Sequence, residues 1–338
     1  MTEPATEPRA TAGPRRRRRS VGELVEAARA GDPRAVARLI SLVENAAPVL
    51  REVAAALVPY TGQAQVLGIT GAPGVGKSTC TSALVTTYRR QGLRVGVLAV
   101  DPSSPFSGGA LLGDRVRMQD HATDPEVFIR SMATRGHLGG LAWATPQAVR
   151  VLDAAGCAVI LVETVGVGQS EVEVAALADT TLVLLAPGMG DAVQVAKAGL
   201  LEVGDIYVVN KADRDGSERV SRDLRHMLAL GERPDGAWTP PIVPSVATTG
   251  EGIDAVVQAA TAHEAHGRET GELTRRRTRR ARAEIEALAL VDLRRRLDRL
   301  PRDRRLDTLT ERVLAGELDP YRAADELVAE MVGDSGMP

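Results

Sequence analysis

The sequence predicts an α/β fold built on a doubly wound, mostly parallel sheet, and two observations support this. From Gln65 onwards, short apolar runs alternate with helical segments, and the runs consist almost entirely of Val, Leu and Ile. Such runs are typical of parallel strands that helices cover on both faces. Polar residues follow directly after the runs, at the strand ends where open α/β sheets bind their ligands. We expect a helical preface before this domain and a helical extension after it.

The composition suits one large domain with helical additions. The chain has 338 residues, 44% of them hydrophobic and 25% charged, so it can bury a substantial core. Aromatic residues make up only 2%, which argues against base-stacking platforms for nucleic acid. The net charge of −2 favours no polyanionic partner. Neither Cys80 nor Cys157 belongs to a C-x-x-C pair, which indicates a reducing compartment and argues against disulfides or a cysteine-rich metal site.

Residues 1–19 are interpreted as a disordered, arginine-rich arm, since Pro, Thr, Glu and Arg dominate it and residues 15–19 are all arginine. A solvated tail is favoured over contact with nucleic acid or acidic lipid. No apolar segment of a secretory signal follows the arginines, and no apolar run approaches the length of a membrane span. We therefore expect a cytoplasmic protein that binds neither membrane nor nucleic acid.

Residues 20–61 predict a small helical preface. Ser20 and Glu23 have the spacing of a capping box, which marks the start of a first helix. An Asp-Pro pair then predicts a second helix that begins at Pro33. A third helix is expected over about 48–57, before the first strand begins.

The α/β domain is expected to span residues 62–265. Its first strand leads into Gly71, and one of its helices is expected over about 141–155. The further strands are predicted from apolar runs, of which the run at 127–129 is the weakest. The runs lie at 93–100, 127–129, 158–162, 180–186, 206–209 and 242–244.

After Gly267 the composition shifts towards Arg and Leu, and residues 266–338 predict a helical extension. Apolar residues recur at steps of three and four on both sides of Pro301, namely Leu290, Leu293, Leu297, Leu300, Leu306, Leu309 and Val313. This spacing predicts an amphipathic helical hairpin with arginines on its outer face. Its apolar stripe would be buried either against the α/β domain or against a second subunit. The arginine-dense residues 275–282 are interpreted as a solvated face rather than a nucleic-acid site.

The pattern G-x-x-x-x-G-K-S, from Gly71 to Ser78, lies between the first strand and its helix and is that of a phosphate-binding loop. Glycines let the backbone N–H groups point at an anion, and the helix that follows presents its positive end. Lys77 would contact the phosphates, and the Ser78 hydroxyl would bind Mg²⁺. An ordinary glycine-rich turn, the alternative, does not require Lys-Ser at this point. The expected nucleotide-binding residues are Gly71, Ala72, Pro73, Gly74, Val75, Gly76, Lys77, Ser78 and Thr79.

The pattern N-K-x-D, formed by Asn210, Lys211 and Asp213, follows the apolar run at 206–209. An aspartate at this position can accept hydrogen bonds from the N1–H and the exocyclic amine of guanine. Adenine offers neither donor there, and an unsatisfied buried carboxylate costs on the order of a few kcal/mol. We therefore expect selection of GTP over ATP. The base would be supported by the next strand end, at Ser245, Val246 and Ala247.

Three carboxylates, Asp101, Asp114 and Glu163, are expected in loops after strands, where they could hold Mg²⁺ through oxygen ligands. Each one alone could be a helix cap or a surface charge, but three in such positions favour a metal site. Glu163 opens the sequence E-T-V-G, in the place of the usual D-x-x-G switch, and Gly166 could donate its N–H to the γ-phosphate. The long, small-residue-rich segment 101–109 is interpreted as the other switch.

Four segments in order resemble the MeaB/ArgK family of P-loop GTPases, the methylmalonyl-CoA mutase-associated members of the G3E group. They are DPSSPFSGGALLGDRVRM (101–118), MATRGHLGGLA (132–142), VETVGVGQSE (162–171) and NKAD. The similarity runs from about Ser20 to the C-terminus. The resemblance implies a GTPase that protects an adenosylcobalamin-dependent acyl-CoA mutase and gates delivery of its cofactor. It also implies homodimers through the C-terminal helices, with GTP or GDP and Mg²⁺ as ligands and no covalently bound cofactor.

The resemblance assigns roles to the matching residues. Lys77 is the phosphate contact, Ser78 binds the metal, and the acids Asp101, Asp114 and Glu163 surround the metal and the attacking water. The sequence departs from the family pattern at Cys80 and Phe106, where small polar residues are more usual. Cys80 is expected to pack as a small hydrophobic residue. For His137, a loop-stabilising role is favoured over a catalytic or cobalamin-contacting one.

Three other functions compete with this one. A nickel or zinc metallochaperone of the same group would carry a Cys- or His-rich motif, and this chain has two separated cysteines and five histidines. A kinase would need a second substrate pocket, and a purely structural scaffold would not need the acidic set. No arginine finger or glutamine can be assigned from the sequence, so slow intrinsic hydrolysis is expected. No residue identifies which acyl-CoA mutase is the partner.

Overall fold

The structure is a computed structural model that describes most of the chain. The described residues are 19–45, 48–101, 118–121, 123–133, 144–164, 170–188, 200–231, 234–297 and 304–333. Nearly all of the predicted arginine-rich arm lies outside them.

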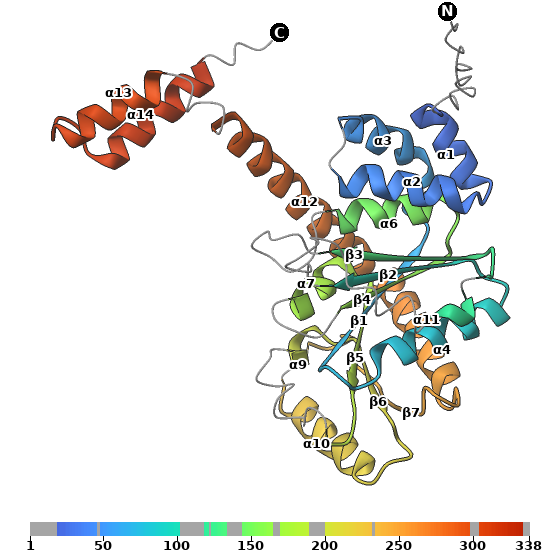
Figure 1. Cartoon of the computed structure of the whole chain (residues 1–338). Coiled ribbons are helices and arrows are strands. Elements are labelled where there is room, and N and C mark those ends of the chain that lie inside the picture. The colour runs from blue at the N-terminus through green and yellow to red at the C-terminus, as the bar shows by residue number, and fades with distance from the viewer. Residues whose placement is uncertain are drawn as a thin grey trace, which may run out of the picture. The chain divides into compact units, whose positions relative to one another are not determined.

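The strands form one seven-stranded sheet in the order β3-β2-β4-β1-β5-β6-β7, and each neighbouring pair runs parallel (Figure 1). This confirms the predicted α/β class and its parallel sheet. The strands are β1 (Gln65–Gly71), β2 (Val95–Asp101), β3 (Val127–Ala133), β4 (Val159–Thr164), β5 (Thr180–Leu185), β6 (Ile206–Asn210) and β7 (Ile242–Ser245).

The strand order places β1 inside the sheet, with β4 on one side and β5 on the other. The loop that follows β1 therefore opens in the middle of the carboxyl edge, where ligands bind in sheets of this kind. The pairing register of β4 sets Glu163 beside Ile69 of β1 and beside Ala99 of β2. A carboxylate at this register position belongs to an interior strand.

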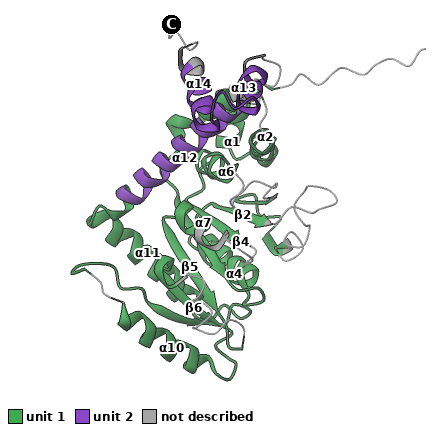
Figure 2. Ribbon diagram, turned by 90° about the vertical axis from the view of Figure 1, so that its left-hand side faces the viewer, with its two compact units in different colours: residues 1–274 green, residues 275–338 purple. Residues whose placement is uncertain are grey.

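Helices cover both faces of the sheet (Figures 1 and 2). The helices α4 (Lys77–Arg90) and α11 (Ile253–Glu269) share one core with Leu67 and Ile69 of β1. On the other face, α6 (Thr145–Ala154) and α7 (Ser170–Leu177) share a core with Val66. This alternation along β1 follows from the two-residue period of a strand. Around the outer strands lie α9 (Leu200–Val203) and α10 (Ser217–Leu230).

The helical preface consists of α1 (Val21–Arg29), α2 (Pro33–Glu44) and α3 (Leu50–Leu57), followed by a short 3-10 turn, η1 (Val58–Tyr60). The predicted capping box is present, since the Glu23 N–H donates to Ser20 Oγ and the Ser20 N–H donates to the Glu23 carboxylate. Buried side chains of all three helices join the core under α6. The preface is thus part of the α/β core.

The strand β3 is longer than the apolar run at 127–129 that predicted it. The sequence signal was weak because a charged residue, Arg130, occupies the middle of the strand. Arg130 pairs with the Glu44 carboxylate of α2 and donates to Ser41 Oγ at 3.2 Å. A partner from the helical preface thus compensates the charge, which the local pattern could not reveal. A short 3-10 helix, η2 (Gln119–His121), lies between the segment predicted as a switch (101–109) and β3.

The C-terminal residues divide from the rest between Thr274 and Arg275, so that residues 275–338 form a second compact unit (Figure 2). The long helix α12 (Glu272–Leu297) leads into it, and α13 (Arg304–Leu314) and α14 (Pro320–Gly333) complete it. The predicted break at Pro301 falls between α12 and α13. An ion pair of 2.7 Å between Arg312 and Glu326 joins α13 to α14, which lies within the predicted helical extension but was not predicted as a separate helix. Within the described residues, no helix combines the length and apolar character needed to cross a membrane.

The two cysteines are free, fully enclosed thiols in separate cores, and this makes a chemical prediction. Burial raises the pKa of Cys80 and of Cys157 to about 12, and the Glu163 carboxylate adds to the rise at Cys80. The reactive thiolate is therefore nearly absent at pH 8. Iodoacetamide should leave both cysteines unmodified in the folded protein and alkylate both in guanidinium chloride, as measured by mass spectrometry. Glutathione in the same tube is the control. Alkylation of either native thiol at a rate near that of glutathione would contradict the buried placement.

Candidate nucleotide site

The loop between β1 and α4 depends on three glycines with left-handed backbone angles. Gly71, Gly74 and Gly76 have φ values of 139°, 80° and 99°. A side chain at Gly71 would also collide with the Leu184 carbonyl of β5, and one at Gly76 with the Asn210 amide. The backbone angles therefore favour glycine at all three positions, and the close neighbours add a second requirement at Gly71 and Gly76.

Lys77 is the first residue of α4, and its side chain folds back over the loop that precedes it. Its ammonium group donates to the carbonyl oxygens of Gly71 at 2.8 Å and Ala72 at 3.1 Å. Only 7% of the residue is exposed. The amino end of α4, with its partial positive charge, opens at the same place. The loop and the lysine together form a cradle suited to the phosphates of a nucleotide.

Glu163 of β4 meets α4 directly below this cradle. Its Oε1 accepts a hydrogen bond of 2.6 Å from Ser78 Oγ, and its Oε2 lies 2.9 Å from Thr81 Oγ1. The glutamate is only 4% exposed, so these contacts lie in the protein interior. A hydroxyl beside a carboxylate is an oxygen-donor set of the kind that Mg²⁺ prefers, and these two of the four predicted metal residues fit that ion.

Thr81 is a site residue that the sequence analysis missed. It lies three residues after Ser78 on α4, and this spacing places both side chains on one face of the helix. The helical spacing alone could have suggested Thr81. The choice of Glu163 as its partner depends on the packing of β4 against α4.

The N-K-x-D segment touches the phosphate-binding loop. Asn210 Nδ2 donates to the Val75 carbonyl at 2.8 Å, and Lys211 Nζ donates to the Gly74 carbonyl at 2.8 Å. On its other side, Asn210 Oδ1 accepts a hydrogen bond of 3.1 Å from the Ala247 N–H. Three loops that are far apart in the sequence therefore meet at one edge of the sheet.

Asp213 lies on this edge with an exposed side chain. The backbone turns to reach it, because Lys211 adopts a left-handed φ of 57° and the Ala212 N–H donates to the Ser245 carbonyl at 3.0 Å. The backbone of Val246 continues this support through a bridge to Glu251. A base seated beside the loop could thus meet the Asp213 carboxylate.

Several predicted residues have no described side chain. Asp101 ends β2, at the same sheet edge as the other candidates, and only its backbone is described. The residues that lie outside the described part are Asp114, Gly166, Phe106 and His137. Of the three predicted acids, Glu163 is therefore the one whose contacts the structure describes.

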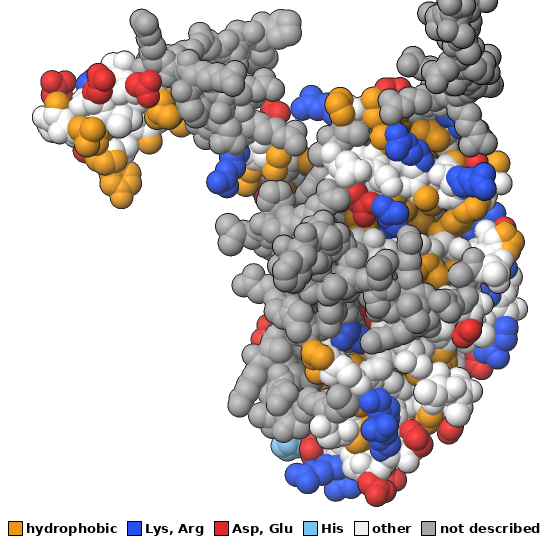
Figure 3. All heavy atoms as spheres, viewed as in Figure 1, with side chains coloured by type: hydrophobic (Ala, Val, Ile, Leu, Met, Phe, Trp, Pro, Cys, Tyr) orange, Lys and Arg blue, Asp and Glu red, His pale blue; other side chains and the backbone are white. Residues whose placement is uncertain are grey.

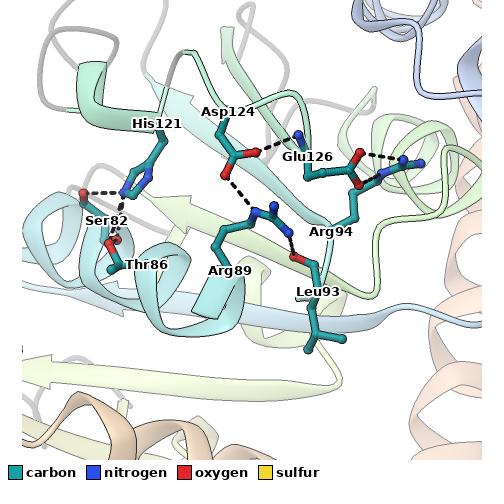
Figure 4. A network of polar contacts seen from close by, with 8 residues as sticks. All are labelled: Ser82, Thr86, Arg89, Leu93, Arg94, His121, Asp124 and Glu126. Atoms are coloured by element: carbon teal, nitrogen blue, oxygen red, sulfur yellow. Dashed lines mark hydrogen bonds and ion pairs between the residues drawn. The ribbon is translucent and has the colours of Figure 1, made fainter. Parts of the chain in front are cut away.

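A polar network ties the turn before β3 to the helix of the phosphate-binding loop (Figure 4). His121 Nε2 lies 3.0 Å from Ser82 Oγ, and Arg89 donates to the Asp124 carboxylate at 2.8 Å. The hydrogen bond from Arg89 lowers the pKa of Asp124. The figure also labels the partners Thr86, Leu93, Arg94 and Glu126. The network holds the chain between η2 and β3 against α4.

Comparisons with known proteins agree with this geometry. The family model described as "Methylmalonyl Co-A mutase-associated GTPase MeaB" matches residues 36–300. A protein of Pyrococcus abyssi that is named as a GTPase is 47% identical over 317 residues, covering 93% of this chain and 97% of that protein. GTPase ArgK of Escherichia coli is 40% identical over 261 residues, covering 74% of this chain and 78% of that protein.

Two further matches extend the comparison. The methylmalonic aciduria type A homolog of Mus musculus, a mitochondrial protein, is 37% identical over 266 residues, covering 78% of this chain and 64% of that protein. The crystal structure of a LAO/AO transport system kinase superposes with a TM-score of 0.66 at 28% identity, covering 92% of this chain and 97% of that one. The chain belongs to the MeaB family of methylmalonyl-CoA mutase-associated GTPases.

Proposed function

We propose that this GTPase binds GTP with Mg²⁺, hydrolyses it slowly and serves as the chaperone of an adenosylcobalamin-dependent acyl-CoA mutase. The observation that carries the nucleotide part is the pair of hydrogen bonds from Asn210 and Lys211 to the loop carbonyls of Val75 and Gly74. They bring a guanine-reading segment and a phosphate-binding loop within reach of one nucleotide.

The residues have separate roles in this proposal. Backbone N–H groups of the loop from Gly71 to Thr79, except Pro73, which has none, and the Lys77 ammonium hold the phosphates, and Asp213 accepts the donors of guanine. Ser78 and Glu163 hold Mg²⁺, which neutralises charge on the phosphates when it is bound. Asp101 and Asp114 complete the acidic set around the attacking water. Phosphoryl transfer depends mainly on positioning and charge stabilisation, which these groups supply.

The mutase part of the proposal depends on the family. The family description names methylmalonyl-CoA mutase, and the Mus musculus relative is named for methylmalonic aciduria. We propose that the partner is a methylmalonyl-CoA mutase or a related acyl-CoA mutase, and that GTP hydrolysis gates delivery of its intact cofactor. Binding to this mutase also raises the rate of GTP hydrolysis.

The C-terminal helices support a homodimer as the working form. Large apolar side chains on α12 are exposed to solvent, and Figure 3 shows apolar groups on the surface of the C-terminal helices. The exposed apolar side chains of α12 are Ile285, Leu288, Leu290, Val291 and Leu293, each 46–67% exposed. Several such groups on one helix are typical of a contact surface, and we propose a second copy of the chain as its partner.

Base recognition can be tested by changing the charge of Asp213. In Asp213→Asn the side-chain amide can donate to the C2 carbonyl of xanthine but cannot accept both donors of guanine. Affinity for GDP should fall by about a hundredfold or more, while affinity for xanthosine diphosphate should rise, as measured by calorimetry. Asp215→Asn, which removes a neighbouring exposed acid, is the matched control and should bind GDP as before. Unchanged GDP affinity in Asp213→Asn would show that another residue reads the base.

The chaperone role can be tested by capture and by kinetics together. Immobilised protein loaded with a non-hydrolysable GTP analogue should retain purified acyl-CoA mutase, and Lys77→Ala should not. GTP turnover of the isolated protein should lie below the kinase range of about 1–100 per second, and the captured mutase should raise it. Turnover already in that range without a partner, or mutases that neither bind nor accelerate it, would count against the proposal.

The second candidate function is a kinase, because the similar solved structure carries that name. With γ-labelled GTP, our proposal expects the label as free phosphate whether or not amino acids or proteins are added as acceptors. The product is identified by thin-layer chromatography and by gel autoradiography. Label that moves stoichiometrically to an acceptor would favour the kinase.

A further inference from the structure

Glu163 stands where GTPase switches usually carry aspartate, so it has one more methylene group and one more rotatable bond. A free glutamate side chain loses rotamer freedom when it is fixed in one conformation. In this structure both carboxylate oxygens meet hydroxyl groups of α4, Oε1 at Ser78 and Oε2 at Thr81. The longer side chain therefore has a contact at each oxygen that limits its orientation.

Thr81 is well placed to supply one of these contacts. It is fully buried, and its Oγ1 lies 3.0 Å from the Lys77 carbonyl and 2.9 Å from Glu163 Oε2. The first contact is the ordinary one of a helical threonine with the carbonyl four residues earlier. A hydroxyl has a single proton to donate, and a carboxylate accepts it more strongly than a neutral carbonyl does.

The surroundings make this orientation matter. Glu163 lies between Ile69 of β1 and Ala99 of β2, in an interior strand with apolar neighbours. Cys80 is close enough for the carboxylate to raise the pKa of its thiol further. If Oε2 lost its hydroxyl contact, the carboxylate could rotate and carry Oε1 away from Ser78.

We infer that Thr81 is a positioning residue for this GTPase site. It holds Glu163 so that Oε1 stays on the Ser78 hydroxyl, the pair that binds Mg²⁺ in the proposed function on which this inference rests. Thr81 does not itself touch the nucleotide. Its effect passes through the orientation of one carboxylate.

The variants Thr81→Val and Thr81→Ser separate the hydroxyl from the packing. Valine has nearly the same shape without the donor, whereas serine keeps the donor. In Thr81→Val, kcat for GTP should fall by about tenfold, as expected for losing one charged hydrogen bond. Bound Mg²⁺ is expected to slow the release of a fluorescent GDP. The Mg²⁺ concentration that gives half of this slowing should rise by a similar factor. KM for GTP at saturating Mg²⁺ should change less than twofold, and Thr81→Ser should restore both values.

The control is Thr261→Val on α11. Thr261 Oγ1 makes the same contact with a carbonyl four residues earlier, Val257 at 3.0 Å, away from the nucleotide site. This variant should leave kcat and the Mg²⁺ requirement unchanged. A loss of thermal stability in Thr81→Val that serine does not restore, with an unchanged Mg²⁺ requirement, would overturn the inference in favour of a packing role.

A double-mutant cycle with Glu163→Asp tests whether Thr81 acts through the glutamate. The shorter carboxylate draws back from Thr81, so adding Thr81→Val should weaken Mg²⁺ retention less than twofold further. Independent, multiplicative effects of the two changes would overturn the inference. Suppose that the wild-type protein binds GDP, that Asp213→Asn no longer does, and that Thr81→Val behaves as wild type. In that case only this inference fails. If the wild type binds no guanine nucleotide, the proposed function fails first.

Discussion

The site depends on one constraint, the contact between the base-reading segment and the phosphate-binding loop. Asn210 and Lys211 donate to two successive loop carbonyls, Val75 and Gly74. This contact is possible because Gly76 has no side chain where the Asn210 amide lies. The parallel sheet supplies the rest, since β1 and β6 end at the same edge. In the proposed function, a phosphate-binding loop and a base-reading loop can then serve one nucleotide.

The interior below the loop couples the nucleotide site to the sheet. Glu163 joins β4 to α4 through hydroxyls at both carboxylate oxygens, in a place where only 4% of the residue is exposed. A buried carboxylate is stable only with such partners. The helix that carries Ser78 and Thr81 is also held from the outside by His121 and Asp124.

Much of the fold could be predicted because its elements have strong local signals. The capping box at Ser20 and the nearly continuous apolar strands can each be predicted from a few consecutive residues. The prediction was weaker at β3, where Arg130 interrupts the apolar run and is compensated by Glu44, which is 86 residues away in the chain. The helix α14 lies within the predicted helical extension but was not predicted as a separate helix, because its apolar positions do not continue the leucine pattern of the helices before it.

By itself, the sequence determined the class of fold and marked the loop from Gly71 to Ser78 and the N-K-x-D segment as candidates for the site, because each depends on residue types at short spacings. The tertiary structure alone decided which loops touch, that Thr81 shares Glu163 with Ser78, and that Asp213 stays exposed beside the loop. These contacts join residues about 80 to 140 positions apart. No local pattern encodes such a pairing, since it follows from the order and register of strands in the finished sheet.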